Sequence, residues 1–219
     1  MAVLLCACAF GLIAAGCHNN NNVHSGYGVA WISLTDEPGD FTSYIVTVSG
    51  LQLTGKTYGL INAITVPETV DFTKLVKFSE LWSSAGVPVD TYTSATIQLD
   101  YSNAQISVQV NGAPVQAKLV DPTGAAVTTV ALTVNFDPNN QLVYQPTYAS
   151  TNALRVAVNF DLAASNRVDL TTSPPTVVVK PYFTIATTAS DSKLIRVRGP
   201  LVNSSVDVGT YSTLSLIHI

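Results

Sequence analysis

Charged residues are scarce in this chain of 219 residues, where they make up 11% of the sequence against 47% hydrophobic residues. An apolar content this high is enough to bury a sizeable core, so we expect a folded protein and not a disordered one. The 10 basic residues are outnumbered by 14 acidic ones, which gives a net charge of −4, and the basic residues are scattered. Because clustered positive charge is what binds a nucleic-acid backbone, nucleic acid is not expected as a partner.

Histidine is almost absent, with three residues in the whole chain. His18 and His24 fall in a polar stretch that we interpret as a flexible tether and not as a metal site, and His218 lies near the other end. The main body therefore offers no histidine base for a Ser or Cys nucleophile and no His-ligated zinc or iron. It also has no Gly-rich loop ending in Lys-Ser or Lys-Thr that would cradle a phosphate.

Carboxylates are the catalytic option that remains. The 14 acidic residues are three glutamates, Glu37, Glu68 and Glu80, and eleven aspartates. An acid and a base from this set could in principle cleave a glycoside, but no spacing in the sequence shows that two of them meet. We therefore predict a protein that is not an enzyme, and keep a carboxylate glycosidase as an alternative.

The N-terminus carries a secretion pattern. Residues 1–16 hold no charge, and their apolar run is too short to span a bilayer but suits the core of a signal peptide, although no Lys or Arg precedes it. The run closes with Ala-Ala-Gly before Cys17, which resembles the bacterial lipobox. This resemblance implies cleavage before Cys17 and attachment of lipid to its thiol. Cys6 and Cys8 would leave with the signal peptide, so no thiol would remain for a disulfide.

A lipid on Cys17 would make the membrane a partner and hold the protein in the cell envelope. Residues 17–26 are then a polar tether, and the lack of Asp just after Cys17 resembles lipoproteins sorted to the outer membrane or cell surface. At the other end, residues 214–219 look like a translated sequencing adapter, so we expect the natural protein to continue beyond Thr213. A genuine C-terminal strand is the alternative.

Alternation of apolar and polar residues dominates residues 27–190, which we assign to one all-β domain. Each alternating run buries one face, and this is typical of an antiparallel β-sandwich, prealbumin-like or immunoglobulin-like. We expect a hairpin turn at Asn103-Ala104 and an edge or bulge at Pro181. The residues expected to face the core include Val46, Val48, Leu51, Ala95, Ile97, Leu99, Tyr101, Ile106, Val108, Leu154, Val156, Val158 and Phe160.

Two segments depart from this pattern. Leu75, Phe78, Leu81 and Trp82 follow one another at helical spacing, which predicts a short helix or turn near residues 73–84. Residues 191–213 follow a polar stretch and are either the start of a second, truncated β domain or the last strand of the first one.

Several stretches resemble one family of domains. The run Ser33-Leu34-Thr35-Asp36-Glu37-Pro38-Gly39-Asp40, followed by a strand containing Val46-Thr47-Val48, resembles the opening of a bacterial and archaeal surface-lipoprotein domain of unknown function (DUF4382). Further matches are residues 70–75, residues 87–93, in which Asp90 stands where the family usually has Gly, and residues 159–162. The resemblance covers about residues 26–185. It implies a β-sandwich on a lipid-anchored surface protein and no known reaction.

The acidic run in this motif has two interpretations. A tight structural turn needs such residues for local hydrogen bonding and unusual backbone angles, and Leu34, Thr35, Asp36, Pro38, Gly39 and Asp40 would form it. Alternatively, the carboxylates of Asp36, Glu37 and Asp40 would bind calcium, which takes oxygen ligands from flexible loops. Apart from this calcium alternative, we expect no cofactor.

Aromatic residues are the last candidates. Tyr and Trp side chains could form a carbohydrate-stacking face, or they could serve packing alone. These residues are Tyr27, Trp31, Tyr58, Tyr92, Tyr101, Tyr144, Tyr148 and Tyr182.

Taken together, the sequence predicts a lipid-anchored envelope protein with a β-sandwich interaction or adhesion module, whose partner is an unidentified surface protein or glycan. One alternative is a carbohydrate-binding module, calcium-stabilised or not, and another is a fimbrial-type subunit completed by a strand from a neighbour.

Overall fold

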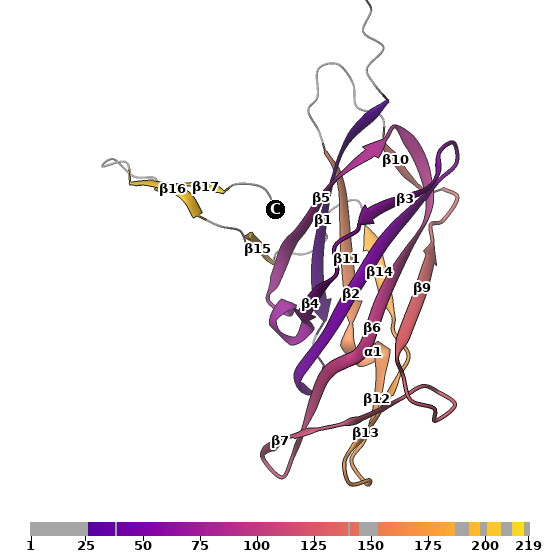
Figure 1. The fold of residues 1–219 in the computed structure, drawn as a ribbon, viewed down its shortest axis with the longest axis vertical. Helices are drawn as coiled ribbons and strands as arrows, with labels where there is room; N and C mark the ends of the chain where they lie inside the picture. The colour runs from indigo at the N-terminus through magenta and orange to yellow at the C-terminus, as the bar shows by residue number, and fades with distance from the viewer. Residues whose placement is uncertain are drawn as a thin grey trace, which may run out of the picture.

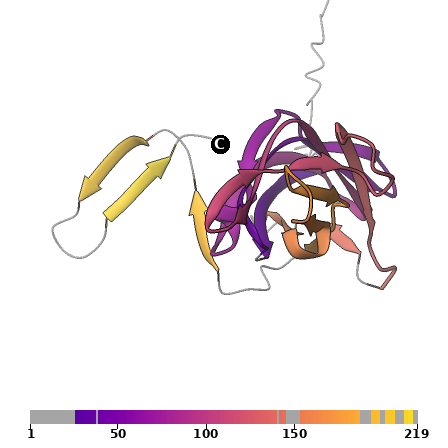
Figure 2. The same cartoon turned by 90° about the horizontal axis from the view of Figure 1, so that it is seen from below.

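The computed structural model confirms an all-β sandwich (Figures 1 and 2). It describes residues 26–37, 39–139, 141–144, 153–186, 193–197, 201–206 and 212–216. The first of its two main sheets has β1 at the centre, in the order β14-β11-β1-β5-β15. β1 pairs with β5 in antiparallel and with β11 in parallel, and β15 also pairs with β5 in parallel. The strands are β1 (Tyr27–Glu37), β5 (Phe78–Pro88), β11 (Leu154–Asp161), β14 (Phe183–Ala186) and β15 (Leu194–Val197).

The second main sheet is antiparallel and is built around two long strands, β2 and β6. β3 and β4 pair with the outer edge of β2, whereas β7, β9 and β10 pair with β6. The strands are β2 (Phe41–Gly55), β3 (Gly59–Ile64), β4 (Glu68–Asp71), β6 (Asp90–Val110), β7 (Ala113–Gln116), β9 (Thr129–Asn135) and β10 (Leu142–Tyr144).

Smaller elements complete the described chain. A three-stranded sheet joins β12, β13 and β8, and β16 pairs with β17. Residues 191–213 thus contribute β15 to the first main sheet and β16 to a separate hairpin. The elements are β8 (Lys118–Val120), β12 (Asn166–Asp169), β13 (Thr176–Val179), β16 (Leu201–Val206), β17 (Ser212–Leu216), the 3-10 helix η1 (Phe72–Leu75) and the helix α1 (Leu162–Ser165).

The core lies between the two main sheets and is formed by the alternating residues that the sequence predicts to face inward. Three aromatic rings join the sheets near η1. The ring centroids of Phe72 and Phe160 lie 4.6 Å apart, and Tyr44 packs at about 6 Å from each. Edge and tilted contacts of this kind add stability beyond the apolar area that they bury. Burial also raises the pKa of Tyr44 to about 12, and its hydroxyl donates to Asn166 Oδ1 at 3.0 Å.

Three local predictions need correction. The helical turn exists at η1, but its continuation to residue 84 is wrong, because Phe78–Pro88 is strand β5 and pairs with β1. The hairpin turn at Asn103-Ala104 is also wrong, because β6 runs on and bulges there, between Asp100 opposite Thr47 and Gln105 opposite Ile45. At Pro181 the chain leaves β13 and enters β14, which belong to different sheets, so the residue marks a change of sheet.

Asp90, which departs from the family pattern, anchors the turn between β2 and β3. Its carboxylate accepts hydrogen bonds from the backbone N–H groups of Thr57 and Tyr58 at 2.9 Å and of Thr91 at 2.7 Å. Desolvation raises the pKa of Asp90, but these hydrogen bonds outweigh it, so the pKa is lowered. Gly55 is required beside it, because a Cβ there would lie 2.2 Å from Asp90 Oδ2.

We expect Asp90→Ala to lower the free energy of unfolding by roughly 2–3 kcal/mol, because three N–H groups lose a charged acceptor. Because the pKa is lowered in the folded state, this contribution is present above pH 4 and is lost as the pH falls through the folded-state value. Chemical denaturation at pH 7 and pH 3 measures both effects. Asp137→Ala, which removes an exposed carboxylate that accepts one hydrogen bond from the Asn139 N–H, is the control and should change stability little. Equal losses in both variants would contradict the assignment.

Candidate functional site

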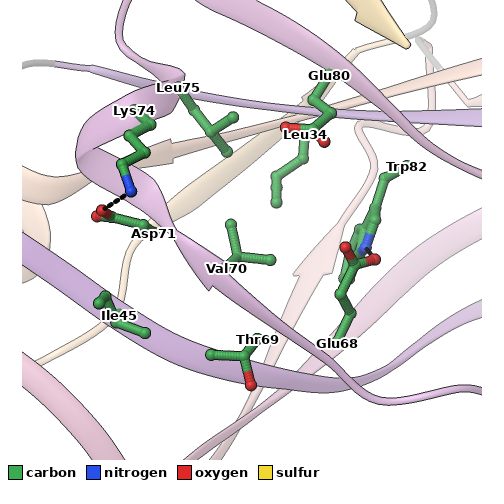
Figure 3. A pocket seen from close by; sticks show the side chains of 10 residues that line it. All are labelled: Leu34, Ile45, Glu68, Thr69, Val70, Asp71, Lys74, Leu75, Glu80 and Trp82. Carbon is green, nitrogen blue, oxygen red and sulfur yellow. Dashed lines mark hydrogen bonds and ion pairs between the residues drawn. The ribbon is translucent and has the colours of Figure 1, made fainter. Parts of the chain in front are cut away.

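A cleft of about 230 Å³ lies on one side of the sandwich, between β4 and η1 on one wall and β1 and β5 on the other (Figure 3). We call it the lower cleft. Its lining combines apolar side chains with a few charged ones, which is the usual character of a ligand site. The lining residues are Leu34, Ile45, Glu68, Thr69, Val70, Asp71, Lys74, Leu75, Glu80 and Trp82.

The fold brings two of the chain's three glutamates, Glu68 and Glu80, to this cleft. Glu68 Oε2 accepts a hydrogen bond from the indole N–H of Trp82, and the two side chains face each other in Figure 3. Glu80 is buried and pairs with the guanidinium of Arg196 at 2.6 Å. Both carboxylates are thus held by fixed partners from within the chain.

The third carboxylate of the lower cleft, Asp71, is held in the same way. It pairs with Lys74 at 3.0 Å and accepts hydrogen bonds from Thr73 Oγ1 and the Tyr44 N–H. Desolvation raises its pKa, but these contacts outweigh it and keep the pKa lowered. Asp71 therefore stays ionised at neutral pH and stabilises the turn that leads into η1.

A second pocket, which we call the upper cleft, continues along β5 from Glu68 and Trp82, the residues it shares with the lower cleft. It has a volume of about 650 Å³ and lies between the β3–β4 connection and the outer edge of β5. The two pockets together form a groove along the side of the sandwich. The upper cleft is lined by Asn62, Ala63, Ile64, Thr65, Val66, Pro67, Glu68, Trp82, Ser83, Ser84, Ala85 and Gly86.

The carboxylates of the predicted acidic turn point in different directions. Asp36 is fully buried on the inner face of β1. Glu37 lies at the end of β1, where it accepts a hydrogen bond from Asn159 Nδ2 at 3.2 Å and pairs with Lys193 at 3.6 Å. Asp40 is exposed. Among the residues that the structure describes, no group of three or more His, Cys, Asp or Glu side chains is placed to hold a metal ion, and calcium binding stays a prediction.

The other turn residues have structural surroundings. Leu34 is buried and lines the lower cleft, and Thr35 Oγ1 donates to the Phe78 carbonyl at 3.2 Å. Gly39 is needed because a Cβ there would lie 2.8 Å from Leu162 Cβ. Pro38 and Cys17 lie outside the described residues.

Lys193, Glu80 and Arg196 are site residues that the sequence did not single out for this role. Lys193 donates to Thr35 Oγ1 at 2.9 Å and to the Asp36 carbonyl at 2.7 Å, although more than 150 residues separate them. Such contacts depend on the parallel pairing of β15 with β5. No pattern in the local sequence predicts that pairing.

The aromatic residues divide into buried and exposed groups. Tyr92, Tyr101 and Tyr144 are buried, and Tyr148 lies outside the described residues. The side chain of Trp31 is 45% exposed on the outer face of the first sheet. The exposed residues of the set are Tyr27, Trp31, Tyr58 and Tyr182, of which Tyr27 and Tyr58 have ring centroids 6.5 Å apart.

Asp36 is a buried carboxyl group whose oxygens both lack a hydrogen-bond partner. Burial raises its pKa to about 8, although the nearby backbone amides of Leu162 and Glu37 and the charge of Lys193 act in the opposite direction. The folded protein therefore holds Asp36 protonated at neutral pH, whereas the unfolded chain ionises it near pH 4. Between pH 4 and pH 8, Asp36 therefore takes up a proton when the chain folds.

We expect stability to fall as the pH rises from 4 to 8, with a slope that approaches about 1.4 kcal/mol per pH unit from this group alone. Asp36→Asn should remove that slope, because the amide does not ionise. Denaturation curves at several pH values measure it, with Asp40→Asn as the exposed control. A pH profile that Asp36→Asn leaves unchanged would contradict this role.

The helices within the described ranges, η1 and α1, are too short to cross a membrane. No curated protein and no solved structure was found to match the chain. Residues 28–168, which include every residue that lines the lower and upper clefts, match the family described as "Domain of unknown function (DUF4382)". This match spans more than half of the chain and agrees with the motifs around Asp36. The chain belongs to the DUF4382 family.

Proposed function

We propose that this protein is a lipid-anchored component of the cell envelope, whose β-sandwich binds a partner through the groove formed by the lower and upper clefts and carries out no reaction. The observation that carries this proposal is the pairing of the groove's carboxylates. Glu80 is tied to Arg196 and Asp71 to Lys74, whereas Glu68 accepts a hydrogen bond from Trp82. Groups held in this way supply shape and charge to a binding surface, and each carboxylate is already engaged by a partner within the chain.

The N-terminal sequence supports the anchor. Cys17 precedes Gly26, where the described structure begins, by nine residues. A chain of that length spans at most about 32 Å when fully extended. A lipid on Cys17 would therefore keep the sandwich close to the membrane surface, where it would meet other envelope components.

Metabolic labelling with a palmitate analogue in a bacterial host tests the anchor. We expect the wild-type protein to take up label and to fractionate with membranes, and Cys17→Ser to lose both properties, because lipid is attached through the thiol. Cys6→Ser and Cys8→Ser are matched controls that should keep the label. Labelling of Cys17→Ser at the wild-type level would rule out this anchor.

A second candidate function is carbohydrate binding, which the outer face of the first sheet favours. Trp31 lies on this face, opposite Ser84 of β5 on one side and Arg155 of β11 on the other. Both of these neighbours are exposed. A flat indole beside hydroxyl and guanidinium donors suits a sugar ring, whose apolar face stacks and whose hydroxyls accept hydrogen bonds.

A glycan array, probed with and without calcium, tests this candidate. If the candidate is right, the wild-type protein binds a glycan class and Trp31→Ala weakens the binding at least tenfold, because the stacking surface is lost. Tyr182→Ala, which removes another exposed aromatic residue, is the control and should bind as the wild type does. An array without binding above background, or equal binding by Trp31→Ala, would dismiss it.

A further inference from the structure

We infer that the outer edge of β5, from Trp82 to Val87, accepts an extended segment of a partner polypeptide as an added β-strand. The inference rests on the proposed binding function and names the class of partner for the upper cleft. Addition of a strand to an open sheet edge is a general mode of peptide recognition, in which main-chain hydrogen bonds give affinity and side-chain pockets give specificity.

The edge is occupied over only part of its length. β15 pairs with residues 78–81 of β5, and within the described residues no strand pairs with the same edge beyond Leu81. The sequence explains why β15 stops, because Gly199 and Pro200 follow it closely and proline cannot donate to a ladder. Six residues, from Trp82 to Val87, remain before Pro88 and extend about 20 Å, the length of an average strand.

In an antiparallel pair, successive residues of a strand turn their N–H and C=O groups alternately toward one neighbouring strand and away from it. This alternation identifies the backbone groups of β5 that are free to pair. Val29 donates its N–H to Tyr144 Oη at 3.1 Å, so its backbone faces away from β5 and the backbone of the next residue, Ala30, faces β5. Ala30 pairs with Ala85, which therefore turns toward β1. Ser84 and Gly86, on either side of Ala85, turn their N–H and C=O groups to the outer edge.

This part of the edge lacks the usual protection against strand addition. Exposed edges are commonly blocked by charged side chains or by proline, but residues 82–87 contain neither. Ser84 and Gly86 are both exposed, and a Cβ built on Gly86 meets no atom within 4 Å. An approaching backbone would find open space at this position.

The upper cleft defines the side chains that the partner would carry. Ile64, Val66, Pro67 and Trp82 form an apolar wall beside the edge. Glu68 lies at the lower end of this wall. The pairing of Arg196 in β15 with Glu80 shows how a basic residue on an added strand meets a glutamate at this groove. The matching partner is thus an extended segment with alternating apolar residues and a Lys or Arg near Glu68.

Selection from a phage-displayed library of random dodecapeptides on the full chain tests the inference. We expect enrichment of peptides that combine alternating apolar residues with a basic residue. A synthetic copy of the most enriched peptide then serves as the probe in fluorescence polarisation. Gly86→Pro and Ser84→Pro should each weaken its binding at least tenfold. Gly86→Ala, which keeps the N–H, should stay within twofold of the wild type.

The proline variants should fold, because each removes an N–H that faces outward and not one that bonds to β1. Hydrogen exchange gives a readout that needs no variant. The amides of Ser84 and Gly86 should exchange at least tenfold more slowly with the peptide bound, and an unchanged rate would overturn the inference. Glu68→Gln should weaken binding about threefold and reduce its dependence on salt.

The other outcomes are equally decisive. If no peptide is enriched, an extended partner segment is ruled out. If a peptide binds but neither proline affects it, the groove's binding role stands while strand addition fails. If the wild-type chain associates with itself and Gly86→Pro does not, the occupant is a second copy of this chain, which would replace the partner proposed here and favour a fimbrial-type subunit.

Discussion

The position of β1 between β5 and β11 determines where every other feature of the site can lie. Its inner face supplies Ala30, Ile32 and Leu34 to the core, and its outer face presents Trp31. Because both of its edges are paired, the sheet can grow only beyond β5 on one side and beyond β14 on the other. The groove therefore forms on the β5 side, where the second sheet ends in β3 and β4.

The same strand carries an electrostatic cost at Asp36. Burying Asp36 without a hydrogen bond to either oxygen is tolerated because the group stays protonated, and a neutral carboxyl costs far less to desolvate than a charged one. Lys193 does not neutralise it through an ion pair, but donates to the backbone carbonyl of the same residue and to Thr35. The acidic motif is thus built into the end of β1, and its three carboxylates do not converge.

Sequence periodicity predicted the parts of this fold that depend on burial. Alternation in Leu154, Val156, Val158 and Phe160 reports that one face of β11 is buried, and it is. Alternation does not indicate which strand lies alongside, so it does not predict the parallel pairings of β1 with β11 and of β5 with β15. The spacing of Leu75, Phe78, Leu81 and Trp82 fits a helix, but tertiary pairing of β5 with β1 overrides that local preference. The candidate site could be predicted even less well from the sequence. Glu68 and Glu80 meet in one cleft only because β4 and β5, which belong to different sheets, lie side by side there.

The location of the groove at the side of the sandwich separates stability from recognition. The aromatic contacts of Tyr44, Phe72 and Phe160 lie inside, so a partner that occupies the groove need not disturb them. At the groove the chain places small residues, Ser84 and Gly86, opposite Trp31 and Val29, and this leaves both the backbone edge and the indole accessible. Trp31 lies on β1, so the width of β5 separates its indole from a strand that bonds to the outer edge at Ser84 and Gly86. A peptide at the edge and a sugar on the outer face would therefore occupy neighbouring but separate surfaces.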